Sequence, residues 1–393
     1  MYVGIFNRVK ILYSFPEPLP LERARGVQVA HAVVELARQG LDGSLSIELA
    51  YVPEGEQHPT RYYGLEPPDN LAFTPLSRAP GWPLSWLLPR LHSNRFFMNR
   101  LEQRIAALQA TTNNERLVVM VRHLKLAAML IDRHPALPLA YEAHEVFGDT
   151  AHAAKQNEQS ALEQRVVQRA ALVLANSAAT AARLKERYGE RRIDVLPNGV
   201  DWPDTLPAKD WNAAGQHIIY SGSFFGWKGV SDLVQAAGDL PGCRITLLGG
   251  NAEQIERERS HLPANGAEVV FRGHVPHGEV AQALGTACIA VLPNRDDPDS
   301  RFTSPIKLYE YMAAGCAIVA SDLPALREVL ADDAAVWVKA GDAHSIAKGI
   351  RSLADSPDLA RAIGERVREQ ARSLTWQARA EKMAALLSAI PQS

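Results

Sequence analysis

Cysteine is scarce in this chain, and the few thiols that occur are scattered. Only Cys243, Cys288 and Cys316 are present among 393 residues, each in or beside a short apolar run. An odd number of widely spaced cysteines is not a disulfide framework, and neither they nor the 12 histidines form pairs at zinc-binding spacing. We therefore expect buried thiols in a reducing cytoplasm and no metal site.

Long hydrophobic runs and a charge excess are also missing. The hydrophobic fraction is 47%, but no stretch approaches the ~18 uninterrupted apolar residues that a membrane-spanning helix needs. A net charge of -2 argues against nucleic acid as a partner. The first residues, MYVGIFNRVKILYSF, are too short and too strand-like for a signal peptide. The length suffices for two ordinary domains, so we expect a soluble, cytoplasmic, two-domain protein.

The first half of the chain follows a strand, loop, helix rhythm. Residues 10–15 predict a strand, and a Pro-rich loop leads to Gly26, which opens a helix that ends at Gly40. Further strands are predicted at 47–52, 117–121 and 171–175. Gly26 would thus lie at the carboxyl edge of a parallel sheet, where a missing side chain lets a ligand approach the backbone.

A basic, aromatic stretch interrupts this rhythm between residues 78 and 104. It carries five arginines against one glutamate, interleaved with Trp82, Trp86, Phe96 and Phe97. Such a stretch is able to lie on an anionic membrane surface, on the inner face of the membrane, or to hold a lipid-linked acceptor. A packed helix pair with solvated arginine ends is the favoured interpretation.

The second half restarts the same rhythm with a glycine-rich turn. A strand at 217–220 is followed by Ser221-Gly-Ser-Phe-Phe-Gly-Trp-Lys-Gly229 and a helix. Backbone amides and Lys228 would form a phosphate cradle in this turn. The spacing fits neither a P-loop nor GxGxxG, which argues against a nicotinamide cofactor.

Residues 294–328 are the stretch around which we expect the site to be organised. A buried strand at 288–292 precedes it, and Ser304-Pro305 have the character of an N-cap and a first helical residue. The free amides of that helix start would bind an anion. Glu310, two turns inside, would accept hydrogen bonds from two ribose hydroxyls, or would simply be a surface carboxylate. Gly315 ends the helix before a strand at 317–320.

Three phrases of the sequence resemble a known family. They are SPIKLYEYMAAGCAIVASDLPALREV from Ser304, the Pro-Asn-Gly-Val-Asp phrase at 197–201, and Tyr-Glu-x-His at 141–144. Together they resemble the family-4 glycosyltransferases, also called glycosyl transferases group 1. The resemblance implies an α/β protein of GT-B architecture, with two Rossmann-like domains facing across a cleft. It further implies an acceptor-side domain at 1–201, a donor-side domain at 216–365, and a helix at 366–393 that returns to the first domain.

The resemblance also assigns roles to individual residues. His144 would face the cleft and, with Lys228, act in catalysis, although a lone histidine is more often structural. Gly26 would border the sugar and the acceptor. The residues implied to bind the donor are Gly26, Gly222, Ser223, Arg272, Gly273, Val275, Thr303, Ser304, Pro305, Ile306 and Glu310.

Two positions depart from the family pattern. Ser223 stands where most members have an arginine, which leaves Lys228 as the principal cation for the diphosphate. Phe302 stands where the family has the first of two glutamates, so that the donor sugar would be recognised elsewhere, through Asp299 or amides near Thr303. Asp297-Pro298-Asp299 imitates the metal-binding DxD of the single-domain glycosyltransferase fold, but two tandem α/β halves argue against that fold.

The predicted activity is hexosyl transfer from a nucleoside-diphosphate sugar, with retained configuration and without metal or cofactor. The acceptor is left open as a glycan, a lipid-linked molecule or a small molecule. One alternative is a nucleotide-sugar epimerase, for which only His144 with Glu142 or Glu145 would supply acid and base groups. Another is a nucleotide-sugar-binding protein without transfer, which Ser223 and Phe302 make credible.

Overall fold

The chain forms two α/β units. The computed structural model describes residues 8–21, 24–79, 93–111, 115–297 and 306–391. The first unit comprises Met1–Pro197 with Trp376–Ser393, and the second comprises Asn198–Thr375.

The first unit contains a parallel sheet with strand order β3-β2-β1-β4-β5-β6-β7. The order reverses between β1 and β4: later strands are added outward from β1 on one side and outward from β4 on the other, while the strands themselves stay parallel. The strands are β1 (Arg8–Leu19), β2 (Leu45–Pro53), β3 (Leu71–Pro75), β4 (Glu115–Val121), β5 (Leu139–Ala143), β6 (Leu172–Ala175) and β7 (Asp194–Val195). The helices are α1 (Ala24–Arg38), α3 (Asn94–Thr111), α4 (Leu124–Arg133), α5 (Phe147–Thr150), α6 (Ala153–Arg169), α7 (Ala178–Tyr188) and α16 (Trp376–Ser388).

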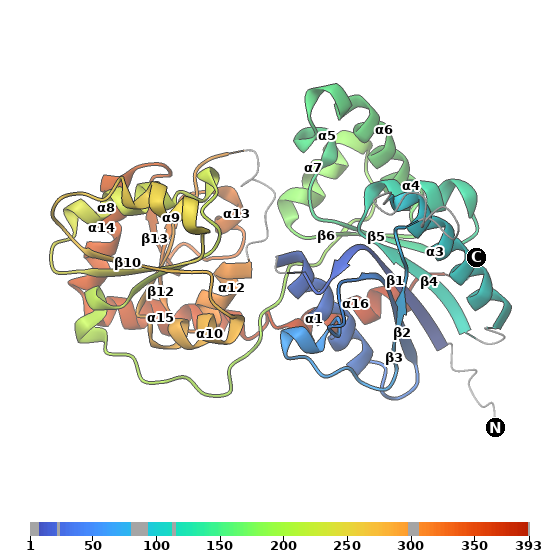
Figure 1. The fold of residues 1–393 in the computed structure, drawn as a ribbon, viewed down its shortest axis with the longest axis horizontal. Helices are drawn as coiled ribbons and strands as arrows, with labels where there is room; N and C mark the ends of the chain where they lie inside the picture. The colour runs from blue at the N-terminus through green and yellow to red at the C-terminus, as the bar shows by residue number, and fades with distance from the viewer. Residues whose placement is uncertain (1–7, 22–23, 80–92, 112–114, 298–305, 392–393) are drawn as a thin grey trace. The chain divides into compact units, whose positions relative to one another are not determined.

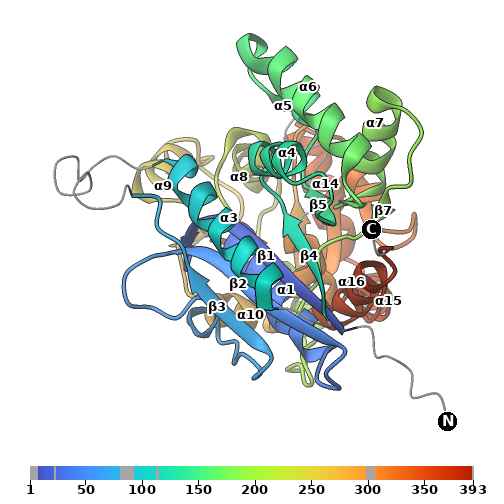
Figure 2. The same ribbon diagram turned by 90° about the vertical axis from the view of Figure 1, so that its right-hand side faces the viewer.

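Helices α1 and α16 cover one face of this sheet (Figures 1 and 2). Tyr13 of β1 and Met120 of β4 belong to the same buried cluster as Val33 of α1 and Met383 of α16. Alternate residues of a strand point to one face, so this cluster identifies which strand positions face α1 and α16. His31 of α1 stacks on Trp376 at the start of α16, with ring centroids 5.0 Å apart.

The second unit repeats the architecture with strand order β10-β9-β8-β11-β12-β13, again parallel throughout. Here the order reverses between β8 and β11. The strands are β8 (Ile218–Ser221), β9 (Arg244–Leu248), β10 (Glu268–Gly273), β11 (Ile289–Leu292), β12 (Ala317–Ser321) and β13 (Val336–Val338). The helices are α8 (Val230–Ala236), α9 (Ala252–Arg259), α10 (His277–Thr286), α12 (Ile306–Ala313), α13 (Pro324–Arg327), α14 (Ala343–Ala354) and α15 (Pro357–Ala371).

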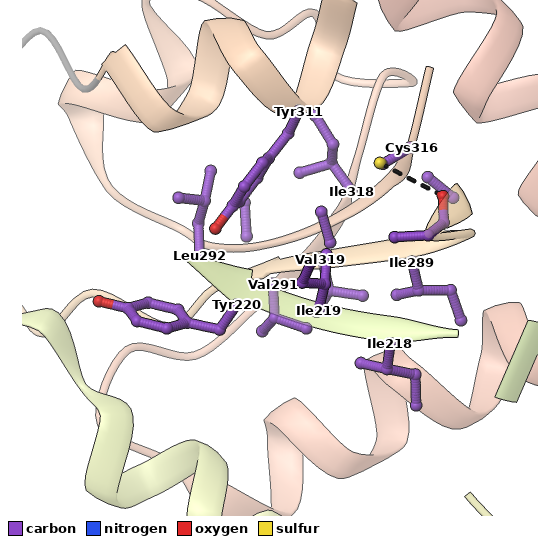
Figure 3. Packing of buried hydrophobic residues seen from close by; sticks show 14 of the residues in the cluster. Ile218, Ile219, Tyr220, Ile289, Val291, Leu292, Tyr311, Cys316, Ile318 and Val319 are labelled. Atoms are coloured by element: carbon purple, nitrogen blue, oxygen red, sulfur yellow. Dashed lines mark hydrogen bonds between the residues drawn. The ribbon is translucent and has the colours of Figure 1, made fainter. Parts of the chain in front are cut away.

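The short apolar runs of the second half form the centre of this sheet (Figure 3). Ile218, Val291 and Val319 come from three neighbouring strands and are all buried. Strands covered by helices on both faces need such continuous apolar runs rather than alternation. All three cysteines are free and buried, as the sequence predicts.

Several elements differ from the sequence-based expectation. Strand β3 and helix α4 lie where no element was predicted. The expected return to the first unit at residue 366 falls instead at Trp376. The reason is that α15 continues to Ala371, and its Val367 and Leu374 just beyond it both pack on the second core. Of the basic stretch, residues 80–92 lie outside the described residues, and α3 accounts for residues 94–104. Within the described ranges, no helix is both long enough and apolar enough to cross a bilayer.

Candidate functional site

The loop after β8 is anchored at its first residues by two tyrosines. The Tyr311 hydroxyl of α12 accepts a hydrogen bond from the Ser221 amide at 2.7 Å and donates one to the Ser221 carbonyl at 3.2 Å. The Tyr220 hydroxyl donates to the Ser223 carbonyl at 2.8 Å. These bonds fix Gly222 and Ser223 at the carboxyl end of β8, beside the point where strand order reverses. Crevices at such reversal points are where open α/β sheets bind ligands.

The far end of the same loop requires a glycine. Gly229 has φ +69°, and a Cβ at this position would lie 1.8 Å from the Pro293 carbonyl oxygen at the end of β11. The Arg295 amide also donates to the Trp227 carbonyl at 2.9 Å. The loop after β8 therefore packs closely against the residues that follow β11, and Lys228 lies between these two contacts in sequence.

Lys228 is a half-buried cation without an anionic partner. Its Nζ lies 4.0 Å from the centroid of the Trp227 ring, and no carboxylate in the described part of the chain lies within ion-pair distance of it. Burial, reinforced by the positive charge of Lys307, lowers the pKa of Lys228 to about 8. A bound anion would therefore relieve an electrostatic cost that the unliganded chain carries.

Lys307 is a second cation near this loop, which the sequence analysis did not single out. It lies in the first turn of α12, and its Nζ is 3.0 Å from Glu310 Oε2. Its charge acts on Lys228, so α12 brings a second lysine within electrostatic range of the loop after β8. The signal was present in the sequence as the lysine of Ser-Pro-Ile-Lys, four residues after Thr303.

The His144 side chain lies in the first unit, next to a buried carboxylate. Glu142 of β5 accepts hydrogen bonds from the Tyr13 hydroxyl at 2.9 Å and from Arg379 Nη2 of α16. His144 Nε2 lies 3.1 Å from Glu142 Oε1. The Asn176 side chain donates to the His144 carbonyl at 3.0 Å, which holds the backbone of this strand end.

Electrostatics keep this histidine neutral and this carboxylate charged. Burial and the Arg122 charge lower the pKa of His144 to about 4, against the opposing effect of Glu142. Burial alone would raise the pKa of Glu142, but His144 and Arg379 together hold it well below its ordinary value. At neutral pH the cluster therefore contains a neutral imidazole beside a carboxylate.

The comparisons with known proteins now bear on the identity of both units. Residues 26–202 match the model of the Glycosyltransferase Family 4, and residues 206–370 match that of the Glycosyl transferases group 1. The chain belongs to the family-4 glycosyltransferases. The family predicted from the three sequence phrases is thus confirmed, and with it the assignment to a family of transferase enzymes.

Solved structures show that this family-4 chain has the GT-B fold. Sucrose-phosphate synthase from Thermosynechococcus elongatus superposes with a TM-score of 0.73 at 19% identity, over 96% of this chain and 98% of that one. An Anabaena protein in complex with UDP and glucose gives a TM-score of 0.70 at 15% identity, over 97% of this chain and 100% of that one. At such identities the likeness shows the fold.

Curated relatives match a smaller part of this chain than the solved structures do. A phosphatidyl-myo-inositol mannosyltransferase of Mycolicibacterium smegmatis is 28% identical over 201 residues, 49% of this chain and 50% of that protein. A D-inositol 3-phosphate glycosyltransferase of Paenarthrobacter aurescens is 28% identical over 235 residues, 55% of this chain and 56% of that protein. The chain spans about half the length of the curated relatives it matches. Neither the epimerase nor the non-transferring binding protein finds support among these relatives.

The other residues predicted to bind the donor lie in different environments, and some of them lie outside the described residues. Arg272 is exposed on edge strand β10, where its Nη2 lies 3.9 Å from Glu279. The Gly273 carbonyl accepts from the Gly249 amide at 2.6 Å, and Val275 packs partly on the core. Ile306 begins α12. Thr303, Ser304 and Pro305 lie outside the described residues, as do Phe302 and Asp299, so their roles stay predictions.

Gly26 has a reason within the chain to lack a side chain. A Cβ there would lie 2.4 Å from both the Leu21 carbonyl oxygen and the Tyr63 hydroxyl. Tyr63 in turn donates to the Leu21 carbonyl at 2.9 Å and accepts from the Leu21 amide at 2.7 Å. Leu21 and Tyr63 therefore explain why this position lacks a side chain, and the predicted contact of Gly26 with the donor stays a prediction.

Proposed function

We propose that this family-4 glycosyltransferase moves a hexosyl group from a nucleoside-diphosphate sugar to an acceptor hydroxyl, with retained anomeric configuration and without a metal ion. The observation that carries the proposal is the half-buried Lys228 at the reversal point between β8 and β11, which has no ion-pair partner among the residues that the structure describes. Retention is proposed from the family pattern.

The charge distribution in the second unit supports a diphosphate as the leaving group. Lys228 follows β8, and Lys307 lies in the first turn of α12 with a charge that acts on it. The positive charge of Lys307 disfavours protonation of Lys228, and a multiply charged anion bound beside Lys228 would offset that effect. Fixed positive charges aimed at developing negative charge can replace a divalent ion in stabilising a leaving diphosphate.

Glu310 supports recognition of the ribose. Its side chain is 11% exposed, and its Oε2 is already 3.0 Å from Lys307 Nζ. A carboxylate has about four acceptor positions, so the ion pair leaves capacity for two hydroxyl donors. Lys307 would thus orient the carboxylate that holds the ribose.

Printed descriptions of relatives agree with this class of donor. The Anabaena structure holds UDP and glucose, and a second structure of the same protein holds UDP-glucose. Two curated relatives are named for glycosyl or mannosyl transfer to inositol-containing acceptors. We propose a nucleotide sugar as donor on this basis, and a hydroxyl of a polar acceptor as the site of transfer.

A donor screen tests the proposal. Purified protein is incubated with UDP-, GDP- and ADP-hexoses and a panel of acceptors, in excess chelator, and the product anomer is read by NMR. We expect one donor to give product with the donor's anomeric configuration at an undiminished rate. Activity that disappears with chelator and returns with manganese or magnesium would refute metal independence, and an inverted product would refute retention.

A further inference from the structure

Arg122, which directly follows β4 in the first unit, is a cation that has no ion-pair partner within the described ranges, as Lys228 is in the second unit. It lies at the reversal point of the first sheet, between β1 and β4, just as Lys228 lies at that of the second sheet. In open α/β sheets such a position is where a ligand is bound. Nothing in the donor chemistry proposed above uses this arginine.

Strand register places Arg122 on the face that α1 and α16 cover. Tyr13 pairs with Met120, and Met120 pairs with Ala140, so these three positions share a face. Alternation along β5 puts Glu142 on that same face, and Arg122, the first residue after β4, continues the alternation of Val118 and Met120. The charge of Arg122 acts on Tyr13, Glu142 and His144, and also on Tyr141.

Glu142 does not serve as the partner of Arg122. Its carboxylate already accepts from the Tyr13 hydroxyl and from Arg379, and it lies 3.1 Å from His144 Nε2. Arg379 is 3% exposed and matches the single negative charge of Glu142. His144 is neutral at neutral pH, so Arg379 already balances Glu142 within this cluster, and Arg122 makes no ion pair with any described residue.

The Arg122 guanidinium is itself unsatisfied. In the part of the chain that the structure describes, it makes no hydrogen bond and no ion pair, and its Nη1 is buried without an acceptor. Buried charged donors without partners are uncommon because they cost stability, and they are retained where a ligand supplies the acceptor. The planar guanidinium fork matches the paired oxygens of phosphate and carboxylate groups.

We propose that Arg122 binds an oxyanion carried by the acceptor, so that the substrate of this glycosyltransferase is a phosphate- or carboxylate-bearing molecule. The acceptor side would then be selected by charge in the first unit, as the donor diphosphate is in the second. The assignment of the oxyanion to the acceptor rests on the proposed function, while binding of an anion at Arg122 is testable without any transfer activity.

The test is anion-dependent thermal stability of the whole chain. Inorganic phosphate, and separately succinate, are titrated into the parent protein, Arg122→Gln, Lys228→Gln, the double variant and Arg165→Gln. Arg165 is an exposed residue of α6 that pairs with Asp132 at 3.1 Å, and it serves as the matched arginine control. The phosphate and succinate arms distinguish the two oxyanions.

We expect Arg122→Gln to weaken the phosphate response at least ~10-fold in apparent affinity, since a charge-assisted bidentate contact is lost. The part of the response that survives should vanish in the double variant, and Arg165→Gln should behave like the parent. A phosphate response unchanged by Arg122→Gln would overturn the proposal. A response lost in Arg122→Gln but unaffected by Lys228→Gln would instead count against the diphosphate site of the proposed function.

Stability without anions provides a second criterion. Arg122 has no partner among the described residues, so Arg122→Gln should unfold in phosphate-free buffer at the same temperature as the parent or higher. Arg122→Lys keeps the charge and should retain part of the phosphate response. If Arg122→Gln instead unfolds several degrees lower without anions, Arg122 is a structural residue and the proposal fails.

Discussion

Binding of a nucleoside diphosphate should be coupled to proton uptake by Lys228. The structure lowers the pKa of this lysine to about 8 from 10.5, because the side chain is half-buried and Lys307 is near. A diphosphate beside the ammonium favours its charged form and returns the pKa towards the ordinary value. The free protein thus carries an incompletely protonated lysine above pH 8, and the complex carries a protonated one.

The size of the effect follows from the two pKa values. At pH 9 the free lysine is about 10% protonated and the bound lysine almost fully, so about 0.9 proton is taken up per diphosphate bound. The sign is fixed: a group whose pKa rises on binding makes affinity fall as the pH rises. Between pH 7.5 and 9 the affinity should fall about eightfold, while the terminal phosphate itself is already ionised.

Titration calorimetry in buffers of different ionisation enthalpy measures this uptake directly. Lys228→Arg is the matched control, because arginine stays protonated over this range and should show neither uptake nor a pH-dependent affinity. Any titration of the nucleotide base is the same with both proteins, so the difference between the parent and Lys228→Arg excludes its contribution. Uptake below ~0.2 proton at pH 9 in the parent, or equal uptake in Lys228→Arg, would show that Lys228 does not face the diphosphate.

The same lysine should matter more for turnover than for binding. Negative charge accumulates on the leaving diphosphate in the transition state, so Lys228→Ala is expected to lower kcat roughly 10²-fold and to change donor affinity less. Steady-state kinetics separate the two. A variant that turns over like the parent would make Lys228 an ordinary turn residue.

Three further outcomes are expected. Glu310→Ala should weaken nucleoside-diphosphate binding by about 1–3 kcal/mol in titration calorimetry, and unchanged affinity in a folded variant would remove it from the site. Gly229→Ala should lower the free energy of unfolding by roughly 1–3 kcal/mol or more in denaturant titration, because a Cβ would meet the Pro293 carbonyl, whereas Gly226→Ala, where a Cβ meets nothing within 4 Å, should not. The pKa of His144 is lowered from 6.5 to about 4, so the unfolded chain takes up this proton at a higher pH than the folded chain does. The free energy of unfolding should therefore decrease as the pH is lowered from 6.5 to 4, by up to ~3 kcal/mol. A His144→Gln variant with an undiminished pH dependence of unfolding would contradict this.

Local signals in the sequence were sufficient for most single elements. The predicted strand at 288–292 is β11, and Ser177 caps α7 with its side chain accepting from the Thr180 amide at 3.0 Å, as serine does at a helix start. Gly315 has φ +64° at the end of α12, as a glycine that terminates a helix should. These features depend on a few neighbouring residues, so periodicity and capping chemistry determine them.

The signal for β3 was weaker. The segment before β3 is rich in proline, glycine and tyrosine with little period, and β3 is a five-residue edge strand. Edge strands are half-exposed and lack the apolar run that marks a central strand. The fold family, in contrast, depended on three phrases of sequence, and the comparisons confirm it.

What each side chain meets was decided by tertiary structure. No local pattern connects Lys307 with Lys228, because they are 79 positions apart and come together only where α12 follows the strand beside β8. The surroundings of Gly26 were likewise decided by folding, since the Leu21 carbonyl and the Tyr63 hydroxyl occupy the space that a side chain there would need.

The charge environment of Arg122 also depends on segments distant in sequence. Its neighbours in sequence do not indicate whether it has a partner. Strand pairing brings Tyr13 to Glu142, and α16 supplies Arg379, so the Glu142 carboxylate already has hydrogen-bond donors. Pairing and burial are properties of segments distant in sequence, and packing alone brings those segments together.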